Sequence, residues 1–277
     1  MAEAVSAVIA LQRVLDAYNN VAVAVSGGVD SLTLATFAHR RLATPVHMFH
    51  AVSSAVPADA TQRVQQLAKD EAWHLTVIDA GEFSDPQYRA NPVNRCFYCK
   101  SHLYDAVAQR TSWQIVSGTN LDDLVEYRPG LDAASARSVR HPYVEAGIGK
   151  QALRGIADSL GLGDIAQLPA SPCLSSRIET AIVIEPDMLE LVHRIETFVS
   201  HATAAPTVRC RVRAEGMVIE LDAPCLQQLS SAVEAEIRTQ AMVLMDRVGR
   251  HYQLSFAVYR NGSAFVHQPG HLGVALP

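Results

Sequence analysis

The chain has 277 residues, of which 49% are hydrophobic and 18% charged, and its formal net charge is −5. This length and apolar content predict a globular protein with two domains of unequal size. The small negative charge excludes a general attraction to nucleic acid or acidic membranes, and no apolar run approaches the roughly 18 residues of a membrane span. Residues 1–20 lack the basic and apolar segments of a secretory leader, so we expect a cytoplasmic location.

The most informative stretch is a short apolar run, residues 21–25, followed by Ser-Gly-Gly-Val-Asp-Ser at residues 26–31 and by helix-compatible residues 32–41. It predicts a strand, a tight loop and a helix N-terminus, an arrangement that binds phosphate through backbone N–H groups and the helix dipole. The loop lacks the lysine of a Walker A site and the spacing of G-x-G-x-x-G. It resembles the PP-loop of the ATP pyrophosphatase superfamily, with a plain Gly-Gly turn as the alternative. The loop predicts ATP use but does not identify the substrate.

Strands alternate with helices in the first half of the chain. We expect helix 3–18, strand 45–50, helix 59–73, strand 75–78, helix 96–110 and strand 113–116. This alternation predicts βαβ crossovers and a parallel sheet with helices on both faces. Ligands of such sheets gather at the carboxyl ends of the strands, where the 26–31 loop, His50 and Ser117 would lie.

The second half begins with an irregular region, residues 118–140, which we interpret as a long functional loop. A helix at 150–160 and a second irregular stretch at 167–177 follow. We then expect helix 187–200, a hairpin of strands 207–213 and 217–221, helix 224–247 and strand 251–258. The predicted fold class is α/β, with a PP-loop ATP-pyrophosphatase domain at residues 1–180 and a smaller α+β domain at 181–277. The second domain would bind substrate phosphate or mediate oligomerisation.

Three of the five cysteines lie at the start of the predicted helix 96–110 or in the irregular stretch 167–177. Cys96 and Cys99 form a C-x-x-C pair, and Cys173 lies in the 167–177 stretch. A single C-x-x-C pair is compatible with zinc, with redox chemistry or with chance, and a closed structural zinc site needs four ligands. Three thiolates can hold a 4Fe-4S cluster with one iron open, so a cluster, zinc and unrelated core thiols all stay open at this point. We expect Cys210 and Cys225 to be inert.

Several motifs occur in a fixed order, and together they resemble the LarE family of ATP-dependent sulfur transferases over nearly the whole chain. They are residues 26–31, Arg-Cys-Phe-Tyr-Cys-Lys at 95–100, Ser-Gly-Thr-Asn-Leu-Asp-Asp at 117–123, Glu-Tyr-Arg-Pro-Gly at 126–130, Pro-Cys-Leu-Ser-Ser-Arg at 172–177 and Val-Arg-Cys-Arg at 208–211.

The resemblance implies a reaction and a sulfur source. The family adenylates a carboxylate of pyridinium-3,5-biscarboxylic acid mononucleotide and exchanges it for a thiocarboxylate, in the synthesis of the nickel-pincer nucleotide cofactor. Some members sacrifice one cysteine, the counterpart of Cys173, whereas others carry three cysteines and a 4Fe-4S cluster that relays added sulfide. This chain matches the three-cysteine pattern. The resemblance therefore implies Cys96, Cys99 and Cys173 as catalytic residues and metal ligands, and argues against the sacrificial route.

The loop and the ends of the strands supply the candidates for binding ATP and Mg²⁺. Asp30 is the expected magnesium-side carboxylate, a role that does not exclude a second one at the start of the helix. Asn120 and Asp123 are candidates for a nucleotide or metal role, with a turn or cap role as the alternative. The predicted cofactor-binding residues are Ser26, Gly27, Gly28, Val29, Asp30, Ser31, Gly118, Asn120 and Asp123.

Arginines supply the candidates for binding the anionic substrate. Arg209, Arg211 and Arg213 alternate along a predicted strand, so their guanidinium groups share one face. The alternative is a solvated face paired to Glu220 across the hairpin; a mononucleotide phosphate would relieve the repulsion between like charges. The resemblance favours Arg209 and Arg211. The remaining candidates lie in the loops: Arg128, Arg177, for which a salt bridge is the alternative, and the weaker Ser176.

Three rival functions remain. A PP-loop tRNA thiolase also combines this loop with three cysteines, but it should carry a basic RNA-binding surface. A synthetase of the NAD or GMP type leaves the cysteines unexplained, and a non-catalytic nucleotide sensor with a structural metal leaves Asp30 and Ser31 unexplained. We expect a small-molecule nucleotide substrate, neither nucleic acid nor membrane as a partner, a sulfide donor that the sequence does not identify, and a homo-oligomer.

Overall fold

The computed structural model describes residues 2–125 and 128–265, so Glu126 and Tyr127 of the 126–130 motif lie outside the described residues. The chain forms two compact units. Unit 1 comprises Met1–Asp85 and Asn94–Ser171, and unit 2 comprises Pro86–Val93 and Pro172–Pro277. The sequence predicts one division after residue 180; the compact units divide after Ser171, and the second also includes Pro86–Val93 from the first half of the chain.

Unit 1 is built on a four-stranded parallel sheet with the order β3-β2-β1-β4. Its central strand β1 pairs with β2 on one side and β4 on the other, so that Ala24 lies opposite both Phe49 and Ser117. The predicted α/β fold class with a parallel sheet is therefore confirmed. The strands are β1 (Val21–Ala24), β2 (Val46–Ala51), β3 (Leu75–Ile78) and β4 (Gln114–Ser117).

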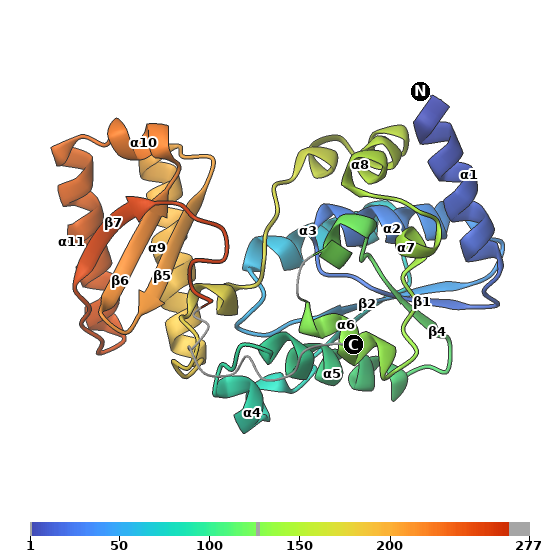
Figure 1. The fold of residues 1–277 in the computed structure, drawn as a ribbon, viewed down its shortest axis with the longest axis horizontal. Helices are drawn as coiled ribbons and strands as arrows, with labels where there is room; N and C mark the ends of the chain where they lie inside the picture. The colour runs from blue at the N-terminus through green and yellow to red at the C-terminus, as the bar shows by residue number, and fades with distance from the viewer. Residues whose placement is uncertain (1, 126–127, 266–277) are drawn as a thin grey trace. The chain divides into compact units, whose positions relative to one another are not determined.

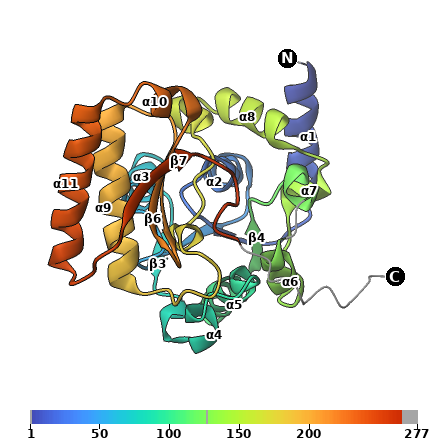
Figure 2. The same ribbon diagram turned by 60° about the vertical axis from the view of Figure 1, so that its left-hand side comes forward.

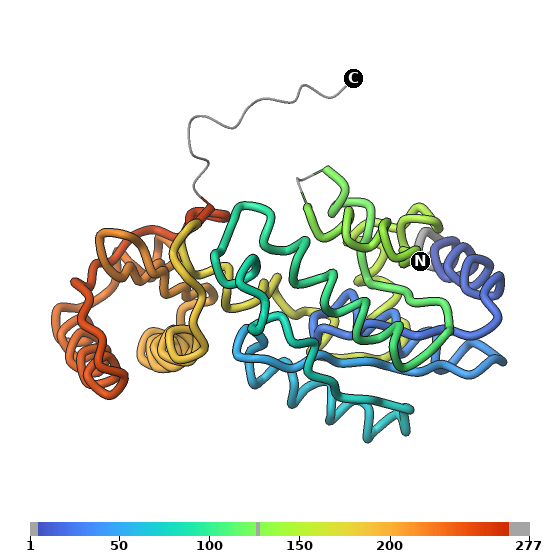
Figure 3. The backbone as a smooth tube through the Cα atoms, turned by 90° about the horizontal axis from the view of Figure 1, so that it is seen from below, coloured from blue at the N-terminus to red at the C-terminus, as the bar shows by residue number. Residues whose placement is uncertain are grey.

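Helices cover both faces of this sheet (Figure 1). Alternate residues of β1 point to opposite faces. Val21 and Val23 pack in a core with α1, α2 and α8, whereas Ala22 and Ala24 pack in a second core with α5 and α6. This burial on both faces explains why β1 is apolar throughout rather than alternating with polar residues. Figure 3 shows the backbone from the side on which α5 lies.

The helices of unit 1 connect these strands. The region 118–140, expected to be a long loop, contains two short helices, and the missing periodicity reflects their brevity. The helices are α1 (Ala2–Asp16), α2 (Val29–Arg41), α3 (Ala58–Asp70), η1 (Glu82–Ser84), α5 (Arg95–Ala108), η2 (Leu121–Val125), α6 (Pro129–Ser135), α7 (Pro142–Glu145), α8 (Lys150–Ser159) and η3 (Gly163–Gln167).

Unit 2 is built on a three-stranded sheet with the order β5-β6-β7. Strands β5 and β6 are antiparallel, and β7 joins β6 in parallel. Figure 2 shows α9 and α11 side by side against this sheet. The elements are α4 (Pro86–Arg89), η4 (Leu174–Arg177), α9 (Pro186–Thr203), β5 (Val208–Arg213), β6 (Gly216–Leu221), α10 (Ala223–Gln227), α11 (Ser231–Arg247) and β7 (Leu254–Val258).

The helix predicted at 224–247 is in fact two helices, because the Ser230 hydroxyl accepts a hydrogen bond from the Val233 N–H at 3.3 Å and starts α11 afresh. The last strand begins at Leu254 rather than at residue 251. Among the helices of the described residues, none combines the length and the apolar character that a bilayer-spanning helix requires.

Candidate functional site

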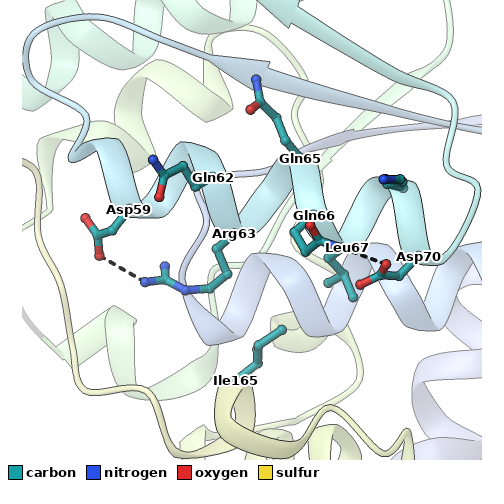
Figure 4. A pocket seen from close by; sticks show the side chains of 9 residues that line it. Asp59, Gln62, Arg63, Gln65, Gln66, Leu67, Asp70 and Ile165 are labelled. Atoms are coloured by element: carbon teal, nitrogen blue, oxygen red, sulfur yellow. Dashed lines mark hydrogen bonds and ion pairs between the residues drawn. The ribbon is translucent and has the colours of Figure 1, made fainter.

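The 26–31 loop joins β1 to α2, as the sequence predicts. Gly27 has a positive φ of 86°, and a Cβ at this position would come within 2.7 Å of the Ala60 carbonyl oxygen. Only glycine satisfies both conditions. The Gly27 carbonyl accepts a hydrogen bond of 2.7 Å from Arg63 of α3, whose side chain also lines the polar hollow shown in Figure 4. The first glycine of the loop is thus fixed by α3.

The N-terminus of α2 has no side-chain cap. Gly28 occupies the N-cap position, and within the described residues the backbone N–H groups of Gly28, Val29 and Asp30 donate no hydrogen bond. The Ser31 hydroxyl instead accepts from the Ser26 N–H at 3.0 Å and lies 3.1 Å from the Ser26 hydroxyl. Unpaired N–H groups at a helix N-terminus, beside two hydroxyls, are donors that suit an anion.

Gly118 brings the end of β4 against this loop. A Cβ on Gly118 would lie 2.9 Å from both the Asp30 carbonyl carbon and the Ser31 backbone nitrogen. Asn120, which is fully buried, then reaches Asp30 with its side-chain amide at 3.4 Å. The predicted strand-end residues and the predicted loop therefore meet at one place in unit 1.

Two carboxylates face a set of cations beside the loop. Asp123 is buried and accepts a hydrogen bond from the Asn120 N–H at 3.2 Å. It also forms ion pairs with Arg128 at 3.0 Å and with Lys150 at 3.4 Å. Lys150 is not among the site residues predicted from the sequence, because no motif marks it and its partner Asp123 lies 27 positions earlier in the chain. The cluster of Asp30, Asn120, Asp123, Arg128 and Lys150 is called the loop cluster below.

Asp30 is electrostatically unusual. Burial, followed by the charge of Asp123, raises its pKa to about 6, although Lys150, Arg154 and Arg128 oppose the shift. Its backbone carbonyl accepts a hydrogen bond from the fully buried Tyr143 hydroxyl at 3.1 Å. A carboxylate whose ionised form is disfavoured by a second carboxylate gains stability from a divalent cation. The two carboxylates of the loop cluster are thus residues that could hold a divalent cation.

His50, at the end of β2, is a further residue to which the sequence analysis gave no role. Its Nδ1 lies 2.8 Å from the Val25 carbonyl oxygen, and its Nε2 lies 3.0 Å from the Thr61 hydroxyl. Burial lowers its pKa. Because a carbonyl only accepts, Nδ1 carries the proton and the neutral ring ties β1 to α3.

The C-x-x-C pair lies near the start of α5. Cys96 and Cys99 are half-buried and three residues apart in the helix, so their side chains lie on one face. Within the described residues, no group of three or more His, Cys, Asp or Glu side chains has the geometry to hold a metal ion. Two thiols on one helical turn nevertheless match the donor chemistry of an iron–sulfur site.

Cys173 belongs to unit 2, where it occupies the N-cap position of η4 and is half-buried. Ser176 and Arg177 in this turn are buried. Arg177 forms a bidentate pair with Glu196 of α9, at 2.9 and 3.0 Å. The alternative role of Arg177 as a salt-bridge residue is therefore present in the structure, with a helix as its partner.

The three alternating arginines of β5 differ in their environments. Arg211 is buried and pairs with Glu220 at 3.0 Å, and Arg213 pairs with the same carboxylate at 3.0 Å. Arg209 is half-buried, with its guanidinium 5.8 Å from the ring centroid of Tyr259, and burial, followed by the charge of Arg177, lowers its pKa. The pairing across the hairpin to Glu220 thus involves two of the three arginines.

The fold and the loop cluster define a class: a two-unit α/β protein with a PP-loop-like strand–loop–helix at the carboxyl edge of a parallel sheet. No protein-family model matches the chain. The chain is 34% identical to the uncharacterized protein slr1717 of Synechocystis over 207 residues, 73% of this chain and 75% of that protein. It is 29% identical to the uncharacterized protein MJ0830 of Methanocaldococcus jannaschii over 136 residues, 48% and 52% of the two chains.

A third relative has a known activity. The chain is 29% identical to the pyridinium-3,5-bisthiocarboxylic acid mononucleotide synthase of Lactiplantibacillus plantarum over 238 residues, 84% of this chain and 81% of that enzyme. The chain belongs to the same family as slr1717. The similarity to the Lactiplantibacillus enzyme supports the LarE family that the motifs indicate.

Proposed function

We propose that this protein is an ATP-dependent sulfur transferase. It would convert the carboxylates of pyridinium-3,5-biscarboxylic acid mononucleotide to thiocarboxylates, a reaction of nickel-pincer nucleotide cofactor synthesis. The observation that carries the proposal is the similarity to a bisthiocarboxylic acid mononucleotide synthase over 84% of the chain. The loop cluster supports the ATP-dependent half of the reaction.

The first step would be adenylation of a substrate carboxylate. A carboxylate oxygen is a poor leaving group, and its attack on the α-phosphate of ATP makes it part of AMP, a good one. The unpaired N–H groups of the loop, with Ser26 and Ser31, would hold the departing pyrophosphate. Asp30 would hold Mg²⁺, with Lys150 and Arg128 balancing the remaining charge.

The second step would be sulfur transfer to the acyl adenylate. We propose that Cys96, Cys99 and Cys173 would hold a 4Fe-4S cluster, because three thiolates suit such a cluster and leave one iron without a protein ligand. When bound, the cluster would supply sulfide as the nucleophile that forms the C–S bond of the thiocarboxylate, with AMP as the leaving group. Cys96 and Cys99 would contribute their thiolates from the start of α5, and Cys173 from the N-cap position of η4.

The anionic substrate needs cationic contacts. Arg128 is exposed, although it pairs with Asp123, and Arg209 is half-buried; we propose that these two arginines contact the phosphate and carboxylates of the substrate. Ser176, Arg177 and Arg211 are predicted substrate contacts as well, and all three are buried: the Ser176 hydroxyl accepts from Arg177 at 3.0 Å, and the two arginines pair with Glu196 and Glu220. We also propose a cytoplasmic homo-oligomer without nucleic-acid or membrane partners.

An anaerobic assay tests the proposal. The purified protein is incubated with ATP, Mg²⁺ and either pyridinium-3,5-biscarboxylic acid mononucleotide or bulk tRNA, and pyrophosphate release is measured. We expect pyrophosphate release in the reaction that contains the mononucleotide and no release in the reaction that contains tRNA. Release only with tRNA would make the protein a tRNA thiolase, and release with neither would overturn the adenylation step.

The sulfur source is tested separately by measuring iron and acid-labile sulfide in the same preparation. We expect both, together with visible absorption that is lost in the Cys96→Ala variant. A colourless, fully active protein with three free thiols would overturn the proposed cluster and leave the adenylation step standing.

A further inference from the structure

The turn that carries Cys173 is buried except at the cysteine itself. Leu174, Ser175, Ser176 and Arg177 are all less than one-tenth exposed, whereas Cys173 is half-buried. Within the turn, the Ser176 N–H donates to the Cys173 carbonyl at 3.0 Å. Cys173 is therefore the partly exposed first residue of an otherwise buried turn.

Arg177 ties this turn to itself and to α9. Its Nη1 lies 2.7 Å from the Pro172 carbonyl oxygen, 3.2 Å from the Cys173 carbonyl oxygen and 3.0 Å from the Ser176 hydroxyl. Its Nε and Nη2 donate hydrogen bonds to Glu196, which also accepts a hydrogen bond from the Cys210 N–H of β5 at 2.8 Å. The guanidinium group of Arg177 thus connects the backbone on both sides of the Cys173 Cα to a carboxylate of α9, which is itself hydrogen-bonded to β5.

Arg211 provides a second attachment. Its Nη1 donates to the Ser176 carbonyl at 2.9 Å, and its Nε donates to Glu220 at 3.0 Å. Both arginines are at most 4% exposed, and both carboxylates are at most 9% exposed. A buried cation that is satisfied by a carboxylate and by carbonyls holds those carbonyls in place, because moving them leaves the charge unpaired.

We propose that Arg177 and Arg211, each held by its glutamate, are positioning residues that fix the turn so that the Cys173 thiol keeps one orientation. The inference rests on the proposed function only in that Cys173 is assigned there to sulfur transfer. It differs from substrate binding, because the fork of Arg177 is occupied by protein groups. The positioning acts through the carbonyls of residues 172, 173 and 176.

The test is the rate at which iodoacetamide alkylates Cys173, resolved from the other cysteines by peptide mass spectrometry in the full-length, metal-free protein. In Arg177→Lys the ammonium keeps the pair with Glu196 but loses the fork that reaches the carbonyls. We expect Cys173 to react about tenfold faster, the effect of about 1.4 kcal/mol on the opening equilibrium of the turn. Cys225 is the internal control and should react at an unchanged rate.

Arg213→Lys is the matched control, because Arg213 pairs with Glu220 and Glu179 and, among the described residues, makes no hydrogen bond to residues 172–177. We expect wild-type alkylation of Cys173 in this variant. An equal acceleration in Arg177→Lys and Arg213→Lys would show general loosening of unit 2 and would overturn the proposal. So would a wild-type rate in a folded Arg177→Lys protein.

Hydrogen exchange in the wild-type protein keeps the proposal testable if Arg177→Lys does not fold. The Ser176 and Ile178 amides should be protected, and rapid exchange of both would contradict a fixed turn. The proposed function is tested independently by the sulfur-transfer activity of Cys173→Ser. If that variant is fully active, the role of Cys173 fails, whereas the alkylation result for Arg177 stands or falls by itself.

Discussion

The loop cluster of unit 1 and the Cys173 turn of unit 2 both gather charged side chains around a tight backbone turn, but they leave their polar groups in different states. At the loop, the N–H groups of Gly28, Val29 and Asp30 donate no hydrogen bond within the described residues, and Asp30 faces a second carboxylate. At the turn, Arg177 donates to Glu196 and to two carbonyls.

This difference distinguishes a loop whose polar groups are available to a ligand from a turn whose polar groups are already paired within the protein. Unpaired donors and a carboxylate with a raised pKa cost folding free energy that a bound Mg²⁺–phosphate group would recover. Fully paired buried charges have little left to offer a ligand and serve to fix geometry. A charged residue in a motif, such as Arg177, can therefore be assigned to ligand binding or to structural support only when its hydrogen-bond partners are known.

The largest effect should come from Asp30→Asn. Loss of the magnesium-side carboxylate should reduce pyrophosphate release by about 100-fold or more. The same substitution should increase the free energy of unfolding. Because the folded-state pKa of Asp30 is raised to about 6, its ionised form destabilises the protein above that pH, so the variant should be more stable by about 1–3 kcal/mol at pH 8.

Urea unfolding of Asp30→Asn at pH 8 and at pH 4 measures this stability term. The gain should disappear near pH 4, where Asp30 is protonated in the folded wild-type protein. Asp59→Asn is the matched control, since Asp59 is also in the first turn of a helix but its side chain is 61% exposed. Equal activity of Asp30→Asn and wild type would remove Asp30 from the site.

Glu220→Gln tests the supporting region. It leaves the buried Arg211 without its carboxylate, and we expect a loss of about 3 kcal/mol or more in the free energy of unfolding. Glu71→Gln, which breaks the more exposed pair with Arg40, should cost about 1 kcal/mol or less. Equal losses in the two variants would mean that the network of Glu220 is no more important than a surface pair.

Gly27→Ala tests whether the loop backbone is fixed by contact. The new Cβ would have a positive φ and would lie 2.7 Å from the Ala60 carbonyl oxygen, so we expect a loss of about 2 kcal/mol or more. Gly81→Ala is the control, because Gly81 also has a positive φ but has no atom within 4 Å of the added Cβ. Gly81→Ala should lose only about 1 kcal/mol, the cost of a positive φ in a residue that has a Cβ. A smaller loss in Gly27→Ala than in Gly81→Ala would show that the loop adapts.

His50→Gln should have the smallest effect, visible in the pH dependence of stability. The pKa of buried His50 is lowered below its ordinary value, so the unfolded chain takes up a proton that the folded protein does not. The contribution of His50 to the free energy of unfolding is complete above about pH 6.5. It is lost as the pH falls below that value, by up to about 1.4 kcal/mol per pH unit. Thermal unfolding between pH 5 and pH 8 should show a shallower slope for the variant; identical slopes would contradict a neutral, buried His50.

Local features of the fold could be predicted from the sequence, and features that depend on distant partners could not. The apolar run of β1 and the two glycines after it are sufficient to predict the strand, the loop and the start of α2. In contrast, the hydrogen bond from Tyr143 to Asp30 joins residues 113 positions apart, and Arg177 finds Glu196 19 positions away. No periodicity encodes such pairs. The break between α10 and α11 depends on one serine cap, which an apolar pattern does not reveal.

The measurement that tests the central claim most directly is mass spectrometry of the mononucleotide after incubation with the anaerobic protein, ATP, Mg²⁺ and sulfide. We predict product ions shifted by one or two oxygen-to-sulfur exchanges, accompanied by AMP and pyrophosphate, and absent with Asp30→Asn. An unmodified mononucleotide, in the presence of folded, metal-loaded protein and ATP, would contradict the proposed sulfur transfer.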